Sequence, residues 1–199
     1  MKILNLYAGI GGNRKLWGDE HEVTAVEIDE EIAGIYKGSF PKDKVVVGDA
    51  HEYLLSHYKE FDFIWASPPC PTHSITNYFL NAQGTIRYPD MKLYEEILFL
   101  KGYFKGKFVI ENVISWYEPL IKPYIYMEHY YWSNFIINGK ESADRKHEAT
   151  VEEKQKLKGF DLSNYKGIDK QKILRNCVEP NAGLEILKMA FKEKQQRLL

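Results

Sequence analysis

Short apolar runs alternate with longer amphipathic stretches along most of this chain. Apolar runs between polar turns are typical of buried strands, and apolar positions three or four residues apart are typical of helices. Because strands and helices alternate, the pattern favours an α/β fold with a mostly parallel sheet. The predicted strands are residues 2–7, 22–27, 43–47, 61–66 and 107–111, and the predicted helices are residues 13–17, 29–37, 50–57 and 90–103.

The pattern changes in the second half of the chain. Residues 124–135 are dense in aromatic side chains and predict one long strand or a hairpin. Residues 138–170 are mostly polar and predict an irregular insertion with one short helix, whereas residues 179–197 predict a closing amphipathic helix. Neither an internal repeat nor a linker divides the chain, so we expect a single domain over residues 1–199.

Composition and charge narrow the class of protein. The chain has 199 residues, of which 44% are hydrophobic, and a net charge of -1, which argues against a broad nucleic-acid packager. It has neither a stretch apolar enough to span a membrane nor a signal-peptide pattern, so we expect a cytoplasmic protein. Two cysteines do not form a disulfide framework, which leaves at least one thiol for another role.

A glycine-rich turn, Tyr-Ala-Gly-Ile-Gly-Gly at residues 7–12, follows the first predicted strand. Such a turn lets backbone N–H groups approach a ligand closely. It lacks the full G-x-G-x-x-G pattern of dinucleotide-binding proteins, and a tight structural turn explains it equally well. Taken alone, the turn is weak support for a cofactor site.

Acidic residues end the next two predicted strands. Glu27 lies where the ribose hydroxyls of a nucleoside cofactor are held, whereas Asp29 is better suited to capping the helix that follows. Asp49 can accept a hydrogen bond from an adenine amino group or cap the helix that begins at Ala50. Both readings of Asp49 stay open at this point.

The most informative segment is Ser-Pro-Pro-Cys-Pro at residues 67–71, directly after the fourth predicted strand. Its prolines hold Cys70 on a stiff turn at the carboxyl edge of the sheet, where open α/β sheets bind ligands. The ordinary alternative is a buried, inert cysteine, but three prolines pack poorly in a core, so the pattern favours a nucleophile. A thiol needs nearby positive charge or a helix N-terminus to ionise at neutral pH. His73 has no evident second partner and is interpreted as a substrate-side or structural residue.

Two further features could complete a site around Cys70. The polar stretch 75–89 is long enough to be a functional loop that closes over the thiol and its substrate. Glu111 ends the fifth predicted strand, which a sheet of this type places beside the strand that leads to Cys70. A partly buried carboxyl there is suited to protonating a ring nitrogen. The alternative role, capping a following helix, is better filled by Asn112 or Ser115.

In this order the segments resemble the DNA cytosine-5 methyltransferases, especially small phage-type members. The resemblance implies a Rossmann-like class I methyltransferase: a mostly parallel twisted sheet with an antiparallel strand near one edge and helices on both faces. It also implies S-adenosyl-L-methionine as cofactor and duplex DNA with a flipped cytosine as substrate. It spans about residues 3–190 and rests on Gly9–Gly12, Glu27–Asp29, Gly48–Asp49, Pro69–Cys70, Glu111–Val113, Tyr131–Phe135 and Arg175–Val178.

The resemblance also implies a role for each matching residue. Cys70 adds to carbon 6 of cytosine while Glu111 contacts the N3 side of the ring, and Glu27, Ile28 and Asp49 hold the cofactor's ribose and adenine. No metal is expected. The other expected catalytic residues are Pro69 and Asn112; the other expected cofactor residues are Tyr7, Ala8, Gly9, Ile10, Gly11, Gly12, Ala50 and Asn176; and the expected substrate residues are Ser74, Arg87 and Val113.

The sequence departs from the family in three places. Pro71 follows the cysteine where glutamine is common. The Gln-x-Arg-x-Arg segment is absent and Glu128-His129-Tyr130 stands before Tyr131 instead, with Arg87 or Arg145 as candidates for an arginine's role. Only about 40 residues, 134–173, replace a target-recognition domain, although sequence readout needs several base-edge contacts. A separate specificity partner or a homodimer is one way to supply them.

Three other functions are considered. One is cytosine methylation in RNA or a free nucleotide, which suits the near-neutral charge and the small recognition region. Another is a non-catalytic subunit that binds nucleotide or nucleic acid, which the intact Pro-Cys and Glu-Asn-Val segments disfavour. A Rossmann dehydrogenase is least favoured, because the glycine pattern is incomplete and such an enzyme gives Cys70 no role.

Overall fold

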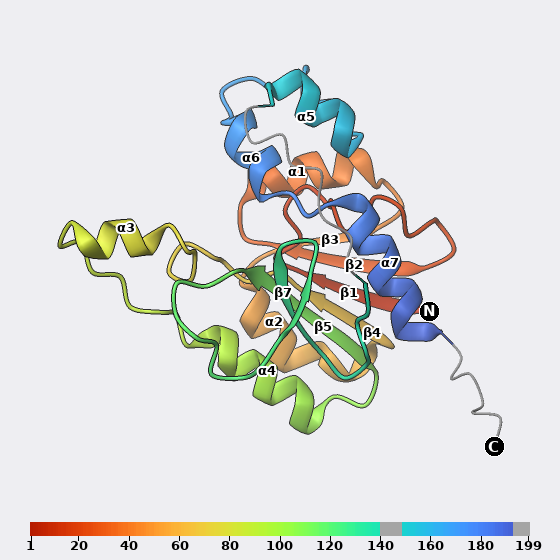
Figure 1. The fold of residues 1–199 in the computed structure, drawn as a ribbon. Helices are drawn as coiled ribbons and strands as arrows, with labels where there is room; N and C mark the ends of the chain where they lie inside the picture. Colours follow the sequence, from red (N-terminus) through yellow and green to blue (C-terminus); the bar gives the residue numbers. More distant parts are fainter. Residues whose placement is uncertain (140–148, 193–199) are drawn as a thin grey trace.

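The computed structural model describes residues 1–139 and 149–192, which form a twisted seven-stranded sheet with helices on both faces (Figure 1). The strand order is β3-β2-β1-β4-β5-β7-β6. The first five strands pair in parallel, and β7 runs antiparallel to both β5 and β6, so the predicted fold class is confirmed. The strands are β1 (Lys2–Leu6), β2 (Glu22–Glu27), β3 (Lys44–Val47), β4 (Phe63–Ala66), β5 (Lys107–Val113), β6 (Tyr124–Tyr126) and β7 (His129–Ser133).

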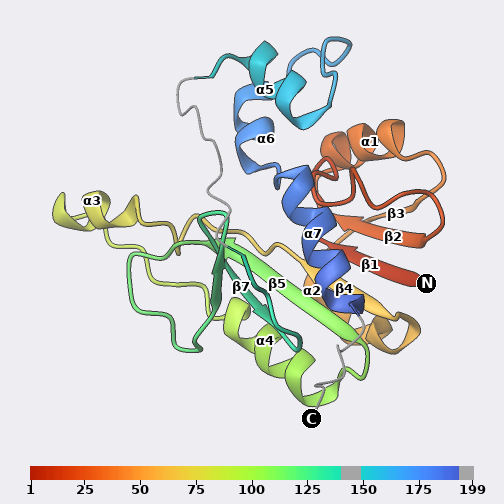
Figure 2. The same ribbon diagram turned by 45° about the vertical axis from the view of Figure 1, so that its right-hand side comes forward.

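The central strands are apolar on both faces because each face is covered. One face packs against α2 (Ala50–His57) and α4 (Lys92–Tyr103), with Leu54 and Ile97 among the fully buried side chains. The other face packs against α1 (Glu30–Ser39) and α7 (Pro180–Phe191), as the two views in Figures 1 and 2 show. Burial on both faces is typical of parallel sheets and explains the continuous apolar runs in the sequence.

The parallel register brings the functional segments to one edge of the sheet. Leu6 pairs with both Val26 and Ala66, and Ala66 pairs with Ile110, so the carboxyl ends of four strands lie level. The segments that follow β1, β2 and β4 therefore begin next to each other, with the end of β5 beside them. This edge is where open α/β sheets bind their ligands.

Several predicted elements differ from the observed ones. Residues 13–17 form turns instead of a helix, because Asn13 and Arg14 turn inward and bond to Asn5 and Asp43. The loop after Cys70 contains α3 (Asn77–Ala82), and α6 (Lys170–Asn176) was not predicted. A short 3-10 helix, Tyr58–Glu60, follows α2.

The aromatic stretch after residue 123 is the hairpin of β6 and β7, one of its two predicted forms. The described part of the polar insertion contains one helix, α5 (Val151–Lys158), as predicted; residues 140–148 lie outside the described residues. The closing helix α7 ends at Phe191, and residues 193–197 of the predicted helix lie outside the described part of the chain. Among the helices of the described chain, none has the length and apolar character to cross a membrane.

Candidate active site

The turn after β1 has several residues with positive φ angles, and close neighbours leave no room for a side chain at two of its glycines. Gly9 and Gly11 have φ angles of 54° and 87°, in the left-handed region that favours glycine, and Tyr7 has φ 54°. A Cβ on Gly11 would lie 2.4 Å from the Phe40 ring. A Cβ on Gly12 would lie 2.2 Å from the Val178 carbonyl oxygen, so the segment before α7 packs directly on this turn.

Glu27 ties this turn to the end of β2. Its Oε2 accepts a hydrogen bond from the Gly9 N–H at 2.8 Å, and its Oε1 accepts from the N–H groups of Ile28 and Asp29 at 3.0 and 3.1 Å. Asp29 caps α1 by accepting from Glu31 and Ile32. The Glu27 carboxylate therefore shapes the loop that faces the pocket, in addition to any role toward a ribose.

A pocket lies where these strand ends meet the start of α4. Of the predicted cofactor residues, Tyr7, Ile28, Asp49 and Ala50 line it, and the predicted catalytic residue Pro69 borders it. Ile28 is 70% exposed and presents an apolar surface to the pocket. The remaining lining residues are Gly48, His51, Pro68, His73, Asp90, Lys92 and Leu93.

Asp49 serves as the N-cap of α2, which was one of its two predicted roles. Its Oδ1 accepts from the N–H groups of both His51 and Glu52, and these bonds lower the pKa of the carboxyl. Within the described residues, Oδ2 has no bond and the carboxylate borders the pocket. A cap role and an adenine-binding role are therefore compatible.

Sequence analysis missed a buried polar cluster next to the pocket. Glu96 is 0% exposed, and its Oε1 accepts from the Tyr7 hydroxyl at 2.5 Å and lies 3.0 Å from Nδ1 of His51. Burial raises the pKa of both Glu96 and Tyr7. The sequence does contain a sign of this cluster: Glu96 falls among the apolar residues Leu93, Ile97 and Leu100 on the buried face of α4. A charged side chain in an apolar stripe indicates a buried partner.

The Pro-Cys segment is held from both sides by side-chain amides. Asn112 Nδ2 donates to the Pro68 carbonyl at 3.0 Å, and Asn77 Nδ2 donates to the Pro71 carbonyl at 2.6 Å. The Cys70 carbonyl accepts from the N–H groups of His73 and Ser74. Cys70 itself is half-buried, so its thiol is fixed in place yet reachable.

The surroundings of the Cys70 thiol act on its ionisation in opposite directions. Burial, and then the negative charge of Glu111, raise the pKa of the thiol, whereas the positive charge of Arg175 lowers it. The net effect is a raised pKa, so the thiol is protonated at neutral pH. Arg175 is a contributor that sequence analysis did not single out; it belongs to the Arg175–Val178 segment that carried the resemblance.

Glu111 is buried near the end of β5, on the strand that pairs with β4 as predicted. Its Oε1 lies 3.5 Å from Nε2 of His129, from the neighbouring strand β7. His73 is also buried, and its Nδ1 lies 2.6 Å from the Tyr117 hydroxyl. Burial lowers the pKa of His73, so this imidazole is neutral.

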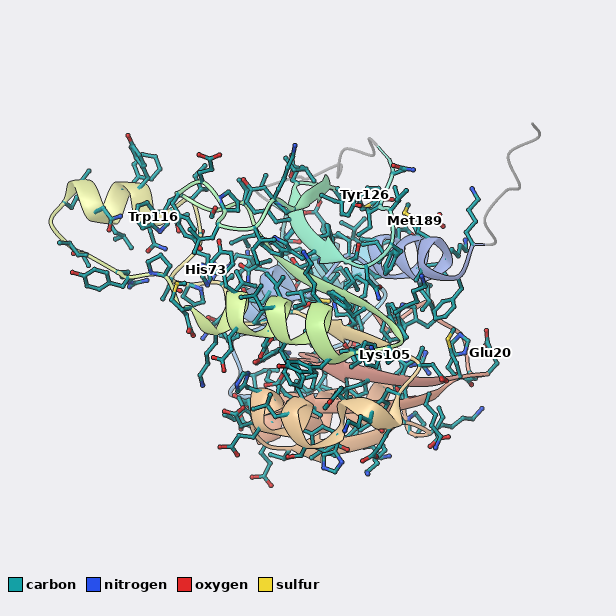
Figure 3. All side chains as sticks on the ribbon, turned by 90° about the horizontal axis from the view of Figure 1, so that it is seen from below. Glu20, His73, Lys105, Trp116, Tyr126 and Met189 are labelled. Carbon is teal, nitrogen blue, oxygen red and sulfur yellow. The ribbon has the colours of Figure 1, made fainter. Side chains whose placement is uncertain are left out.

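The structure separates the predicted substrate residues. Ser74 lies close to Cys70 and bonds to Thr76, and Val113 ends β5, but Arg87 is exposed on the arm formed by residues 75–89, which carries α3 away from the body (Figure 1). Figure 3 shows His73 and Trp116 at the base of this arm, where the backbone N–H of Trp116 donates to the His73 carbonyl. Arg145, the other candidate arginine, lies outside the described residues.

Comparison with known families identifies the class of protein. The model of the C-5 cytosine-specific DNA methylase family matches residues 1–119, which is more than half of the chain. Together with the Rossmann-like fold, this match defines a methyltransferase domain. The chain belongs to the C-5 cytosine-specific DNA methylase family, whose cofactor is S-adenosyl-L-methionine.

Solved structures similar to this chain are distant. A hypothetical protein of Thermus thermophilus is 17% identical, with a TM-score of 0.43, over 66% of this chain and 73% of that chain. A putative prophage DNA modification methyltransferase from E. coli is 22% identical, with a TM-score of 0.40, over 59% of this chain and 33% of that chain. A DNMT2 mutant from Spodoptera frugiperda is 26% identical, with a TM-score of 0.38, over 56% of this chain and 35% of that chain. This chain thus spans about a third of the last two, and curated protein sequences give no match.

Proposed function

We propose that this chain methylates carbon 5 of cytosine in DNA through a covalent adduct with Cys70. The observation that carries the proposal is the position of Cys70: on a rigid loop, beside the buried Glu111, and next to a pocket bordered by Tyr7, Ile28 and Asp49. In this proposal residues 1–199 form a single catalytic domain, and residues 134–173 stand in place of a full target-recognition domain.

The residues of the pocket fit the nucleoside part of the cofactor. S-adenosyl-L-methionine, when bound, supplies the methyl group. Ile28 offers an exposed apolar surface to a purine, and Asp49 offers a carboxylate oxygen to its amino group. Glu27 stands at the end of β2, where it can reach ribose hydroxyls. The other proposed cofactor residues are Ala8, Gly9, Ile10, Gly11, Gly12, Ala50 and Asn176.

The proposed chemistry begins when the Cys70 thiol loses its proton to water. The thiolate forms a bond to carbon 6, the C5–C6 double-bond pair becomes a C4–C5 double bond, and the C4–N3 double-bond pair moves to N3, which takes a proton from Glu111. Carbon 5 is thereby made nucleophilic. After methylation, water takes the proton from carbon 5, the C5–H pair restores the C5–C6 double bond, and the S–C6 pair leaves with the thiolate. Loss of the N3 proton to Glu111 completes the product. Asn112 and Pro69 keep the thiol aligned throughout.

The raised pKa of Cys70 sets a requirement on this first step. Because most thiol is protonated at neutral pH, addition depends on the small thiolate fraction, which Arg175 increases. Ser74, Arg87 and Val113 are proposed on the substrate side. The cytosine must leave the base stack to reach Cys70. Because residues 134–173 are few for reading several base edges, a separate specificity partner or a homodimer is also proposed.

The main experiment measures transfer of tritiated methyl groups from the cofactor to four acceptors: duplex DNA, single-stranded DNA, tRNA and dCMP. We expect incorporation into DNA that disappears in the Cys70→Ser variant. Transfer only to tRNA or dCMP would replace the DNA substrate with the RNA or nucleotide alternative. Transfer that survives Cys70→Ser would contradict the covalent mechanism.

Trapping with DNA that contains 5-fluorocytosine tests the covalent adduct directly. Fluorine at carbon 5 cannot leave as a proton does, so the thiol stays bonded to carbon 6. We expect a peptide adduct at Cys70 by mass spectrometry. The chain has one other cysteine, and the Cys177→Ala variant should form the same adduct.

A further inference from the structure

The two ends of the 75–89 arm are joined by hydrogen bonds just after Cys70. Thr72 precedes the arm and Asp90 follows it, and the Asp90 N–H donates to the Thr72 hydroxyl oxygen at 3.0 Å. The segment after β5 bonds to the same place: the backbone N–H of Trp116 donates to the His73 carbonyl, and its ring N–H donates to the Thr72 carbonyl at 3.1 Å (Figure 3). We refer to residues 72–74, 90, 116 and 117 as the root of the arm.

The His73 ring lies inside this root, and the residue is only 1% exposed. Its Nδ1 lies 2.6 Å from the Tyr117 hydroxyl oxygen, and the Tyr94 hydroxyl of α4 donates to the same oxygen at 3.2 Å. The Tyr94 oxygen accepts in turn from the backbone N–H of Leu120 at 3.2 Å. One series of hydrogen bonds therefore connects the loop of Cys70, the helix α4 and the segment after β5.

The direction of this series fixes which nitrogen of His73 carries a hydrogen. A backbone N–H only donates, so the Tyr94 oxygen accepts from Leu120 and its own hydrogen goes to Tyr117. The Tyr117 hydroxyl then donates its hydrogen to Nδ1 of His73. Reversing either bond between side chains leaves a tyrosine hydroxyl hydrogen without an acceptor among the described residues. Nδ1 is therefore a bare acceptor, and the hydrogen of the neutral ring lies on Nε2.

The second ring nitrogen extends the series to the far end of the arm. Burial lowers the pKa of His73, whereas the charge of Asp90 and a hydrogen bond with the Asp90 backbone raise it; burial is the larger effect, so the ring is neutral. The Asp90 N–H is already bonded to Thr72, so the group that bonds the ring is the Asp90 carbonyl, which accepts from Nε2–H. His73 and Asp90 also both line the pocket.

We propose that His73 is a positioning residue that holds the Cys70 loop and the two ends of the arm together, through an acceptor at Nδ1 and a donor at Nε2. The inference rests on the proposed function, in which the thiol must lie within reach of carbon 6 of cytosine. The Cys70 carbonyl accepts from the His73 N–H, so the ring and the thiol belong to one hydrogen-bonded loop. The arm can then move without displacing the thiol. An apolar side chain could fill the same space, but it could not orient the Tyr117 hydroxyl or bond the Asp90 carbonyl.

The kinetic test compares His73→Leu, which loses both ring nitrogens, with Tyr117→Phe, which loses the hydroxyl group, and with the double variant. Initial rates are measured at saturating cofactor over a range of DNA concentrations. We expect each single variant to lower kcat about fivefold or more, with KM for DNA within about twofold, because the thiol is misaligned after DNA has bound. The double variant should be no slower than His73→Leu, since both changes remove the same bond. A raised KM with unchanged kcat, or losses that multiply in the double variant, would overturn the proposal.

A conservative variant separates bonding from the filling of space. His73→Asn places an amide oxygen near the position of Nδ1, where it can accept from the Tyr117 hydroxyl. We expect its kcat to exceed that of His73→Leu by about threefold or more. Equal rates for the two variants would show that the ring only fills space, which overturns the proposal. Tyr103→Phe is the matched control, because Tyr103 ends the same helix α4 but is 64% exposed, and it should keep the wild-type kcat.

Nitrogen-15 NMR of the histidine ring tests the bonds without any methyl transfer. We expect a hydrogen on Nε2 of His73 and a bare Nδ1 that accepts a hydrogen bond. In Tyr117→Phe the Nδ1 signal should shift toward that of a bare nitrogen without a bond, whereas Tyr103→Phe should leave it in place. A hydrogen on Nδ1, or an Nδ1 signal that Tyr117→Phe does not change, would overturn the proposal.

Hydrogen exchange measures the Cys70 loop itself. The N–H groups of His73 and Ser74 both donate to the Cys70 carbonyl. In Tyr117→Phe we expect these two groups to exchange about threefold faster or more, because a loosened root lets the loop open more often. Unchanged exchange would overturn the positioning role. If the wild type transfers no methyl group while the NMR and exchange results are as expected, the proposed function fails and the positioning of the Cys70 loop by His73 stands.

Discussion

At the scale of single residues, the loop that fixes Cys70 also works against its ionisation. The Asn112 bond to Pro68 and the surrounding prolines hold the proposed nucleophile in a half-buried position. The same burial raises its pKa and lowers the thiolate fraction. The positive charge of Arg175, about 100 residues later in the chain, partly offsets this rise in pKa. The position of Cys70 could be predicted from sequence, but its protonation could not, because Arg175 reaches it only through the tertiary fold.

Removing the charge of Arg175 should therefore slow the reaction of Cys70 with iodoacetamide. Arg175 lowers the pKa of the thiol, so in Arg175→Gln the pKa rises further above the ordinary 9.0 and the thiolate fraction at pH 8 falls. We expect alkylation of Cys70 about two- to fivefold slower, followed by mass spectrometry of the intact peptide.

The rate should increase with pH in both proteins up to at least pH 9, since the pKa of Cys70 lies above that value. Lys172→Ala, an exposed charge on the same helix, is the control and should leave the rate unchanged. Cys177 reacts more slowly in all of them, because burial raises its pKa to about 12. An Arg175→Gln rate equal to wild type would contradict the electrostatic role.

At the scale of elements, local patterns predicted the parallel strands and most helices well. Residues 22–27 and 50–57 are a strand and a helix with the predicted ends, because capping residues and apolar periodicity act locally. Residues 13–17 were mispredicted as a helix, because buried polar contacts of Asn13 and Arg14 override helix propensity. The packing of α7 against the turn after β1 could not be predicted from sequence either, since it depends on contacts between distant parts of the chain.

That adjacency makes Gly183 of α7 intolerant of any side chain. A Cβ at this position would lie 2.1 Å from the Asn13 carbonyl oxygen, which is backbone and cannot move away cheaply. We expect Gly183→Ala to lower the free energy of unfolding by about 2–3 kcal/mol in urea denaturation. It should also weaken cofactor binding, measured by calorimetry, because the displaced turn borders the pocket.

Gly34 provides the matched substitution. It lies inside α1 with no atom within 4 Å of an added Cβ, so Gly34→Ala should raise the free energy of unfolding by about 0.5–1 kcal/mol. Equal changes in the free energy of unfolding for the two substitutions would show that helix propensity alone determines them. The close packing of Gly183 against Asn13 would then have no energetic effect.

At the scale of the whole molecule, the candidate site draws on both sides of residue 119, where the family match ends. Residues 1–119 contain the glycine-rich turn after β1, Cys70 and Glu111. Residues after 119 add His129 on β7 and Arg175 at the end of α6, next to the segment that packs on Gly12. The residues before 119 could be proposed from sequence because each lies in a contiguous motif. The residues after 119 could not, because they come close to Glu111 and Cys70 only in the folded chain.

The arm of residues 75–89, which carries α3, projects from the body of the molecule (Figures 1 and 2). Tyr78, Phe79 and Tyr88 on this arm are 66%, 70% and 82% exposed, which is unusual for large apolar side chains. If the arm closes on DNA, its exposed backbone should become protected. Arg87 lies on the arm outside any helix and offers a trypsin site.

We expect trypsin to cut after Arg87 early in the free protein, and duplex DNA with S-adenosylhomocysteine to slow this cut about fivefold or more, because closure removes the local openings that proteolysis needs. Gel electrophoresis and mass spectrometry of the fragments follow the cut. Lys166, exposed in the loop between α5 and α6, supplies an internal control site whose cleavage should not change. Equal protection at both sites would indicate general stabilisation by ligands, and no protection at Arg87 would mean that the arm stays open when DNA binds.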